Sequence, residues 1–171
     1  MENEIREIQV ACFLLDGEIY AVDIMRIKEI IRPQKLAVLP KTPPFVEGVL
    51  NLRGQVIPVI DLRKRFDMAP RKIDHNRRLL IISLAGCTIG LAVDEVTEVI
   101  TVPVANIKPP PQITRGVDAE YLLGVCLADD SLIMLLSPDT LLSWRETAEL
   151  SSLEEVGIGV TPPDAGVDAI K

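Results

Sequence analysis

The chain has little of the chemistry that most enzymes and metal sites use. His75 is its only histidine and lies in a polar, basic segment, so a histidine-based triad or metal cluster lacks material. The three cysteines, Cys12, Cys87 and Cys126, are odd in number, far apart and set among apolar residues. That pattern favours buried free thiols over disulfides or a zinc site. Neither the GxGxxG nor the GxxxxGK[ST] phosphate motif occurs. We therefore expect no catalytic residue, no cofactor and no metal ion.

The chain also lacks a long apolar run and an excess of basic residues. No run approaches the roughly 20 apolar residues that span a membrane, and no charged-then-apolar signal begins the sequence. We expect a cytosolic protein without direct membrane insertion. The net charge of −7 argues against a nucleic-acid scaffold. One basic segment, residues 63–78, is better explained as a solvated loop than as a phosphate site.

What the chain does contain indicates an all-β fold. Aromatic residues make up only 4% of it, while 48% of the residues are hydrophobic, mostly Val, Ile and Leu, which favour strands. Thirteen prolines and ten glycines, well dispersed, are typical of short strands joined by turns. The expected strands are 10–15, 19–24, 28–31, 49–52, 56–60, 79–84, 88–93, 96–102, 121–127 and 132–136.

Short helices are expected between and after the strands. A tight turn is expected near 23–27 and a helical turn from Leu62 to Phe66. Ser137 as N-cap and Pro138 in the first turn predict a helix that runs to about Ala148. The polar stretch Glu2 to Ile8 is expected to fray.

The stretch GVLNLRGQVIPVIDL, Gly48 to Leu62, predicts a β-hairpin that ends in a helix cap. Arg53-Gly54 is the turn, because Gly54 accepts the positive φ of a tight turn. Pro58 has no N–H, so its strand is an edge or its nitrogen faces away from a partner strand. The carboxylate of Asp61 can cap the helical turn that begins at Leu62.

The order of these segments indicates an internal duplication. Aligning Leu15 with Leu84, and Gly48 with Gly124, brings strands, turns and caps of the two halves into register. Two halves, about 10–70 and 79–148, therefore suggest two small barrels that share one apolar interface. Some positions differ between the halves: Asn51 aligns with Leu127, Arg53 with Asp129, and Pro58 with Met134. The repeated fold does not explain those differences, so we expect a functional reason for them.

From about Ile8 to Leu142, the chain resembles the CheW family of chemotaxis adaptors. The similarity rests on NLRGxxxPVxDL from Asn51, YAVDIMRIKEII from Tyr20, LPKTPPFVEG from Leu39, GLAVDEVTEVI from Gly90 and YLLGV from Tyr121. The resemblance implies two five-stranded SH3-like barrels that share a hydrophobic core, and no enzymatic activity. It implies one CheW-like domain, residues 1–149, and residues 150–171 are expected to form a flexible acidic tail.

The resemblance also implies partners. These adaptors couple chemoreceptors to a CheA-type histidine kinase: one edge meets the kinase, and a groove between the barrels takes the tip of the receptor. We expect a monomer that joins arrays with its partners at the membrane. An adaptor of twitching or another chemosensory pathway is an open alternative. A small-barrel module that binds a ligand or nucleic acid is another, which the acidic charge and few aromatics disfavour.

Candidate contact residues follow from the resemblance and from the unmatched repeat positions. The receptor site is predicted to comprise Ile24, Ile27, Ile30, Asn51 and Arg53. The kinase site is predicted to comprise Gly48, Arg53, Gly54, Val56, Asp129 and Asp130, at two surfaces near residues 48–60 and 127–132. Pro58, Asp61 and Leu62 are predicted to be structural.

Three of these assignments have alternatives that the sequence leaves open. The isoleucines at a spacing of three can instead pack in the core. Asn51 can instead satisfy the backbone of the turn, and Arg53 can be a mere solubility charge.

Overall fold

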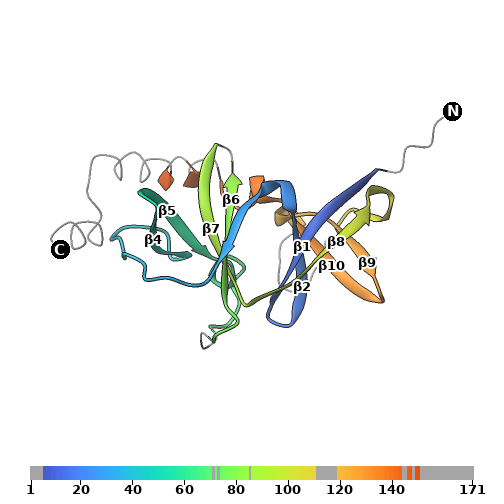
Figure 1. Ribbon diagram of the computed structural model, residues 1–171, viewed down its shortest axis with the longest axis horizontal. Coiled ribbons are helices and arrows are strands. Elements are labelled where there is room, and N and C mark those ends of the chain that lie inside the picture. The colour runs from blue at the N-terminus through green and yellow to red at the C-terminus, as the bar shows by residue number, and fades with distance from the viewer. Residues whose placement is uncertain are drawn as a thin grey trace.

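The described part of the chain forms ten strands arranged in two five-stranded sheets (Figure 1). The computed structural model describes residues 6–70, 72, 74–84, 86–110, 119–143, 146–147 and 149–150. Sheet A has the order β8-β1-β2-β10-β9 and sheet B the order β3-β6-β7-β5-β4. The strands are β1 Glu7–Leu15, β2 Glu18–Asp23, β3 Ile27–Ile31, β4 Val46–Leu52, β5 Gln55–Asp61, β6 Arg78–Leu84, β7 Cys87–Val93, β8 Glu95–Pro103, β9 Leu122–Ala128 and β10 Ser131–Leu136.

Three hairpin turns have the backbone that a two-residue turn needs. The two turn residues have positive φ in Asp16-Gly17 (54° and 79°), in Arg53-Gly54 (52° and 86°) and in Asp129-Asp130 (49° and 64°). Positive φ at both positions matches the right-handed twist of the paired strands. The Arg53-Gly54 turn was therefore predicted correctly.

The start of β1 differs from the expectation that Glu2 to Ile8 frays. Glu7 and Ile8 are paired in register with Pro103 and Val102 of β8. Pairing with the long strand β8 therefore orders these two residues despite their polar neighbours. Residues 1–5 lie outside the described part.

Each sheet is assembled from both halves of the duplication, not from one half as the sequence suggests. The first half gives β1 and β2 to sheet A, and β3, β4 and β5 to sheet B. The second half gives β6 and β7 to sheet B, and β8, β9 and β10 to sheet A. The chain therefore passes from one sheet to the other between β2 and β3, and again between β7 and β8, near the middle of the molecule (Figure 1).

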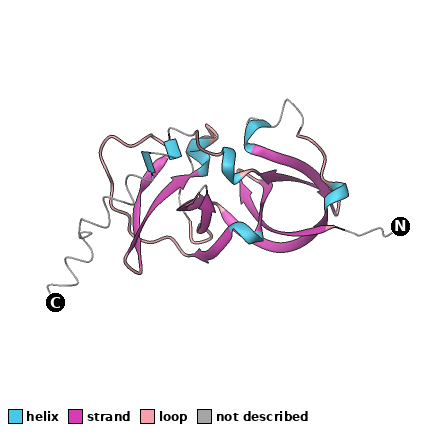
Figure 2. Cartoon of the chain, turned by 90° about the horizontal axis from the view of Figure 1, so that it is seen from above, coloured by secondary structure: helices cyan, strands magenta, loops and turns pink. Residues whose placement is uncertain are grey.

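Both sheets close into barrels by the same device. After β3 the chain turns back, and Ala37 exchanges two backbone hydrogen bonds, of 2.9 and 2.8 Å, with Val49 of β4. After β8, Lys108 exchanges two of 2.8 Å with Val125 of β9. In each case the continuation of one edge strand meets the other edge strand. Figure 2 shows one sheet curling into a ring.

A glycine stands at each closing contact. A Cβ atom at Gly48 would lie 2.5 Å from the carbonyl oxygen of Ala37, and one at Gly124 would lie 2.5 Å from that of Lys108. The two glycines are the residues that the sequence alignment places opposite each other. Close approach of two backbones therefore explains why both halves carry glycine there.

The apolar residues form three clusters, which fits two barrels that pack on each other. One cluster consists only of sheet A residues and a second only of sheet B residues, so these are the barrel interiors. The third and largest cluster draws on both sheets and lies between the barrels. All seven residues of β7 are buried, because one face of this strand meets the interior and the other meets the opposite barrel.

Pro58 lies in an inner strand, since β5 is between β4 and β7. The parallel pairing with β7 involves Val59, Ile60 and Asp61, so Pro58 lies just before the paired stretch. The missing N–H of the proline is therefore accommodated where the β7 ladder begins.

The short helix α1, Leu62–Arg65, begins as expected. The Asp61 carboxylate accepts a hydrogen bond of 2.9 Å from the Arg63 backbone N–H, which is a helix N-cap. Leu62 is fully buried in the inter-barrel cluster. Asp61 and Leu62 therefore have the structural roles that the sequence predicts for them.

The start predicted for the C-terminal helix is wrong. After Ser137 the chain makes one 3-10 turn, η4 (Pro138–Thr140), and the Ser137 side chain makes no capping hydrogen bond. The cap lies at Ser143: its hydroxyl accepts from the Glu146 backbone N–H (3.1 Å), and its own N–H donates to the Glu146 carboxylate (2.8 Å). This reciprocal pair is a capping box, so the N-cap lies at Ser143, six residues after the predicted cap at Ser137.

The end of the described chain is held against the core by Arg65. Its guanidinium donates to the Leu141 carbonyl oxygen at 2.7 Å, pairs with Glu146 and lies 4.5 Å from the Phe45 ring centre. Leu150, the first residue of the expected tail, is helical and 2% exposed in the inter-barrel cluster. Residues 151–171 lie outside the described part.

The closing contact makes a test of barrel closure. We expect Gly124→Ala to lower the free energy of unfolding by about 1–3 kcal/mol, the usual cost of overpacking. The new methyl group would meet the rigid backbone of Lys108. Gly90→Ala is the matched control, since its Cβ would meet a side-chain methyl of Val59 at 3.3 Å. Urea unfolding measures both variants, and equal losses would contradict the role given to Gly124.

Candidate functional site

A β-bulge places two of the candidate isoleucines on one face of β3. The pairing with β6 shifts between Ile27 and Glu29, so Ile27 lies opposite Ile82 and Ile30 opposite Leu80. Ile82 and Leu80 are two residues apart on one strand and both belong to the inter-barrel cluster. Without the bulge, a spacing of three would put the two isoleucines on opposite faces.

The three isoleucines differ in exposure. Ile24, in the 3-10 turn η1 (Ile24–Arg26), is half-buried. Ile27 is half-buried too and packs against the inter-barrel cluster, whereas Ile30 is 41% exposed. Ile30 is therefore the member of the set that offers an apolar surface, and Ile27 is largely a core residue.

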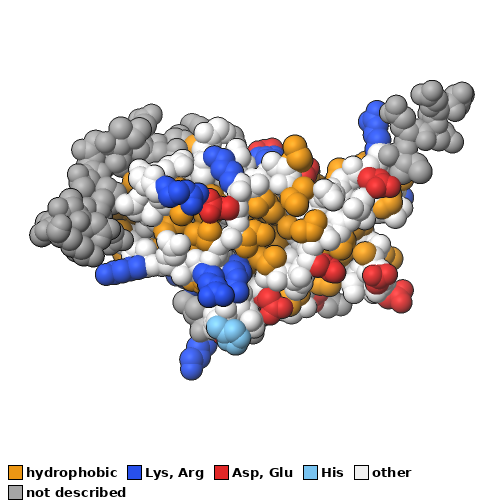
Figure 3. Space-filling model, viewed as in Figure 1, with side chains coloured by type: hydrophobic (Ala, Val, Ile, Leu, Met, Phe, Trp, Pro, Cys, Tyr) orange, Lys and Arg blue, Asp and Glu red, His pale blue; other side chains and the backbone are white. Residues whose placement is uncertain are grey.

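Strand β8 repeats this arrangement in the second half. A bulge opposite Cys12 and Phe13 puts Val96 and Val99 on one face, where they lie opposite Phe13 and Ala11. Val96 packs against the inter-barrel cluster and Val99 is 49% exposed. Strands β3 and β8 thus each carry one exposed aliphatic side chain, Ile30 and Val99, beside the inter-barrel cluster. Figure 3 shows hydrophobic side chains gathered over the middle of the molecule, between the two sheets.

The turn η1 is fixed by Arg26. Its guanidinium donates to the Ser83 carbonyl oxygen at 3.0 and 3.1 Å, and pairs with Asp139 of η4 at 2.6 Å. The hydrogen bond from Arg26 lowers the pKa of Asp139, because it stabilises the carboxylate. These contacts hold Ile24 and the start of β3 against β6 and η4.

Arg53 connects the turn of the β4–β5 hairpin to β3. Its guanidinium forms an ion pair with Glu29, which lies next to Ile30 on β3. The Arg53 side chain is 71% exposed, so part of its donor set faces solvent. Arg53 was predicted for both sites, and its position between the hairpin end and β3 is compatible with either.

The side chain of Asn51 serves the turn itself. Its Oδ1 accepts a hydrogen bond of 3.0 Å from the Gly54 backbone N–H. Of the two interpretations that the sequence left open, the geometry supports the one in which Asn51 satisfies the turn backbone.

The remaining candidates for the kinase site fall into two groups. Gly54, Asp129 and Asp130 are exposed at the two hairpin turns, and Val56 is half-buried beside the first. Gly48 is buried at the barrel-closing contact, where it presents no side chain to a partner.

Sequence reasoning did not single out a strip of exposed leucines on the β9–β10 hairpin. Leu123 is 58% exposed, Leu127 69% and Leu132 46%, and Leu127 lies directly opposite Leu132. Leu123 and Leu127 are four residues apart on one strand, so they share its outer face. The sequence feature that could have indicated this strip is a strand, LLGVCLA in β9, with apolar residues on both faces, which is unusual when one face meets water.

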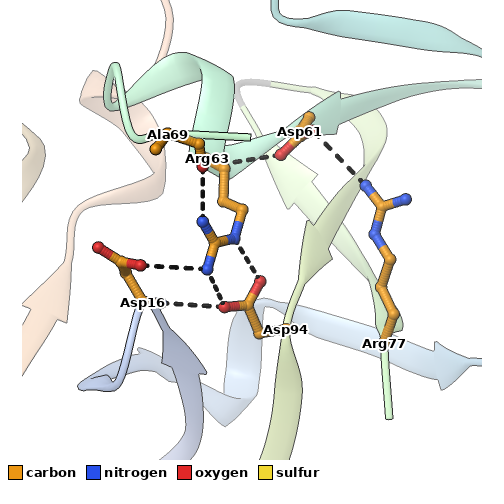
Figure 4. Close-up of polar contacts among 6 residues, drawn as sticks. All are labelled: Asp16, Asp61, Arg63, Ala69, Arg77 and Asp94. Carbon is orange, nitrogen blue, oxygen red and sulfur yellow. Dashed lines mark hydrogen bonds and ion pairs between the residues drawn. The ribbon is translucent and has the colours of Figure 1, made fainter. Parts of the chain in front are cut away.

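Below the β4–β5 hairpin lies a network of buried ion pairs (Figure 4). The Arg63 guanidinium donates two hydrogen bonds of 2.8 Å to Asp94 and one of 2.8 Å to the Ala69 carbonyl oxygen, and pairs with Asp16 at 3.3 Å. The network thus joins α1 to the β1–β2 turn and to the junction of β7 and β8. The side chains of Arg63 and Asp94 are only 9% and 14% exposed, so the bonds between them are shielded from solvent, whereas Asp16 is mostly exposed.

A second arginine, Arg77, serves two carboxylates beside that network. Its guanidinium donates to Glu47 at 2.6 Å and lies 3.6 Å from the Asp61 carboxylate. Burial raises the pKa of Glu47, and the nearby Asp61 adds to the rise, while the bond from Arg77 opposes it. In the described residues, no group of three or more His, Cys, Asp or Glu side chains could hold a metal ion.

With this geometry established, comparison with known proteins gives the family. The family model of the CheW-like domain matches residues 9–146. The chain belongs to the CheW family. The solved scaffolding protein TtCheW from Thermoanaerobacter tengcongensis superposes with a TM-score of 0.77 at 34% identity, covering 85% of this chain and 94% of that one. The two five-stranded barrels are therefore the SH3-like barrels of the CheW fold.

Relatives of this chain carry different names. It is 33% identical over 151 residues to Chemotaxis protein CheW of Treponema pallidum, covering 86% of this chain and 89% of the relative. It is 34% identical over 117 residues to Protein FrzA of Myxococcus xanthus, covering 68% and 72%. Within the described residues, none of the helices has the length and apolar character needed to span a bilayer.

The raised pKa of Glu47 in this CheW fold predicts a pH-dependent stability. A carboxyl group whose pKa is higher in the folded state binds its proton more tightly there, so it favours folding at low pH. That contribution is lost as the pH rises from the ordinary glutamate pKa through the raised one. Glu47→Gln, which cannot ionise, should therefore melt at a higher temperature than the wild type above this range, and the difference should shrink toward pH 4.

Calorimetric melts from pH 4 to 8 check this expectation. Glu7→Gln is the control, because Glu7 is exposed at the start of β1. A difference that grows as the pH falls would show that Arg77 holds Glu47 in its ionised form.

Proposed function

We propose that this chain is a non-enzymatic adaptor that couples chemoreceptors to a CheA-type histidine kinase in chemotaxis. Membership of the CheW family supports the proposal, as do relatives named as chemotaxis proteins and a solved relative described as a scaffolding protein. As such an adaptor it would work in the cytoplasm and be recruited to receptor arrays at the membrane.

The observation that carries the proposal is the presence of separate exposed apolar surfaces on one double barrel. Exposed aliphatic side chains lie at the margin of the inter-barrel core, Ile30 on β3 and Val99 on β8. The other surface is the leucine strip on the β9–β10 hairpin. Exposed apolar surfaces of this kind mark sites of protein association, and two of them let one molecule hold two partners.

The receptor surface is assigned to the margin of the inter-barrel core. A receptor tip is a helical hairpin, and a helix packs its apolar face against aliphatic walls. Ile30 supplies such a wall, with Ile24 and Ile27 supporting it from below. The adjacent Arg53–Glu29 pair supplies polar groups at the rim.

The kinase surface is assigned to the hairpin ends. The barrel-closing contacts bond β4 at Val49 and β9 at Val125, and both strands extend past these contacts toward their hairpin turns. Strand ends of this kind can associate with similar barrels. The chemistry of the two ends differs: Arg53 and Asn51 stand on the first, where the second has Asp129 and Leu127. The two ends therefore suit two different contacts, as an array requires.

One comparison favours a second candidate function. The similarity to Protein FrzA extends over 68% of this chain, and that relative is not named as a chemotaxis protein. An adaptor with the same two contacts in another chemosensory pathway is therefore the second candidate.

Substitutions at the two apolar surfaces should each weaken binding to a different partner. Ile30→Glu should weaken binding to a chemoreceptor cytoplasmic fragment by about 2 kcal/mol or more, roughly 30-fold, and spare the kinase. Leu132→Glu is the matched variant, similarly exposed, and should weaken only binding to the kinase.

Calorimetric titration with each partner and a thermal melt of each variant measure these effects. If Ile30→Glu lowered the melting temperature and abolished both interactions, Ile30 would be a core residue. If the wild type bound neither partner, the adaptor function would be wrong.

The acidic turn of the β9–β10 hairpin separates the two kinase contacts. Two contacts per molecule should let the chain form complexes larger than 1:1 with the CheW-like domain of the kinase. Replacing Asp129 and Asp130 by lysine should stop assembly at the 1:1 complex, because only one contact is lost. Analytical ultracentrifugation measures this, with Glu7→Lys as the charge-reversal control. Loss of the 1:1 complex, or unchanged assembly, would contradict two separate contacts.

A further inference from the structure

A charged pocket lies on the sheet B side of the molecule, apart from both surfaces assigned above. Its volume is about 210 Å³, and it lies among β4, the end of β5, α1, the segment after α1 and the end of β7. Its lining includes Glu47, Asp61, Arg63, Arg77, Met68 and Pro70. Figure 4 shows Asp61 at the end of β5, Arg63 on α1, Arg77 just before β6 and Asp94 just after β7.

The buried part of the pocket carries more carboxylates than cations. Glu47, Asp61 and Asp94 are each less than 20% exposed as side chains, and so are Arg63 and Arg77. Three acids against two guanidiniums leave one excess negative charge among these buried side chains. A buried excess charge is costly unless a proton or a cation compensates it.

The excess charge is located at Glu47 and Asp61, which share Arg77. Arg63 already has Asp94 and Asp16, so it does not serve this pair beyond the backbone N–H that Asp61 caps. The raised pKa of Glu47 agrees with this accounting, since burial and Asp61 both disfavour its ionised form. The carboxylate pair can therefore accept further hydrogen bonds from a cation.

The fold itself does not require this pocket. In the second half, the positions that correspond to Glu47 and Asp61 are Leu123 and Ser137, and Arg77 corresponds to Ile8 of the first half. The same barrel is thus built without the charges of Glu47 and Arg77. Buried charges that the repeated fold does not need indicate a function.

We propose that this pocket binds the basic side chain, arginine or lysine, of a partner protein. Such a side chain has an aliphatic stem and a cationic head, and the pocket offers a counterpart for each. Met68, Pro70 and Ala92 provide apolar wall, and Glu47 with Asp61 provides the acceptors. The exposed Lys64 and Lys72 beside the pocket suit acidic residues that flank the basic one in the partner.

Titration of the full chain with n-butylguanidinium, followed by backbone amide NMR, tests the proposal. We expect weak but saturable shifts centred on Glu47, Ala92 and Asp94. Glu47→Gln should bind the probe at least tenfold more weakly while keeping its fold, since the amide oxygen still accepts from Arg77. Glu7→Gln should bind as the wild type does.

A second variant tests the pocket without removing a charge. Pro70→Lys places a tethered ammonium at the exposed wall, which should fill the site and block the probe. A thermal melt of each variant separates loss of binding from loss of fold.

Three outcomes would overturn the proposal. The first is an absence of saturable shifts in the wild type, and the second is binding that survives in both Glu47→Gln and Pro70→Lys. The third is much tighter binding of free putrescine than of n-butylguanidinium, which would assign the pocket to a small diamine. None of these outcomes bears on the receptor and kinase surfaces, so failure here leaves the proposed adaptor function intact.

Discussion

The burial of the two barrels against each other is the constraint on which the rest of the structure depends. The barrel interiors of the described residues contain only seven and six buried apolar residues, too few to stabilise a small barrel alone. The cluster between them has 21, drawn from both sheets and from the C-terminal segment. Exposed aliphatic side chains such as Ile30 and Val99 occur where this shared core reaches the surface. The proposed receptor surface is therefore the margin of the interaction that holds the molecule together.

Much of the fold could be predicted because its signals are local. Turn dipeptides such as Arg53-Gly54 set the hairpins, and the alternation of apolar residues set the strands. The capping residue Asp61 was visible for the same reason, whereas the competing cap at Ser143 was overlooked in favour of Ser137. The exchange of the β1–β2 and β6–β7 hairpins between the two halves could not be predicted. A strand pattern indicates which face is apolar and does not indicate which strand is its neighbour.

The candidate site was less predictable, because it depends on contacts between distant residues. A spacing of three placed Ile27 and Ile30 together only through a bulge that pairing with β6 creates. Gly48 and Asn51 stood out in the motif, yet one closes a barrel and the other satisfies a turn. The cluster of Glu47, Asp61 and Arg77 joins residues up to 30 positions apart, and no sequence motif indicates it.

The exchange of strands between the halves has a consequence for how the chain folds during synthesis. Strand β1 is bonded in register to β8, so that Val10 lies opposite Ile100. Sheet A stays incomplete until β10, which ends at Leu136, has left the ribosome, although its first hairpin emerges at the outset. Contacts between residues so far apart in the sequence slow folding. The edges of β1 and β2 stay unpaired until β8 and β10 have been synthesised. The two repeated halves of this chain therefore cannot fold one after the other.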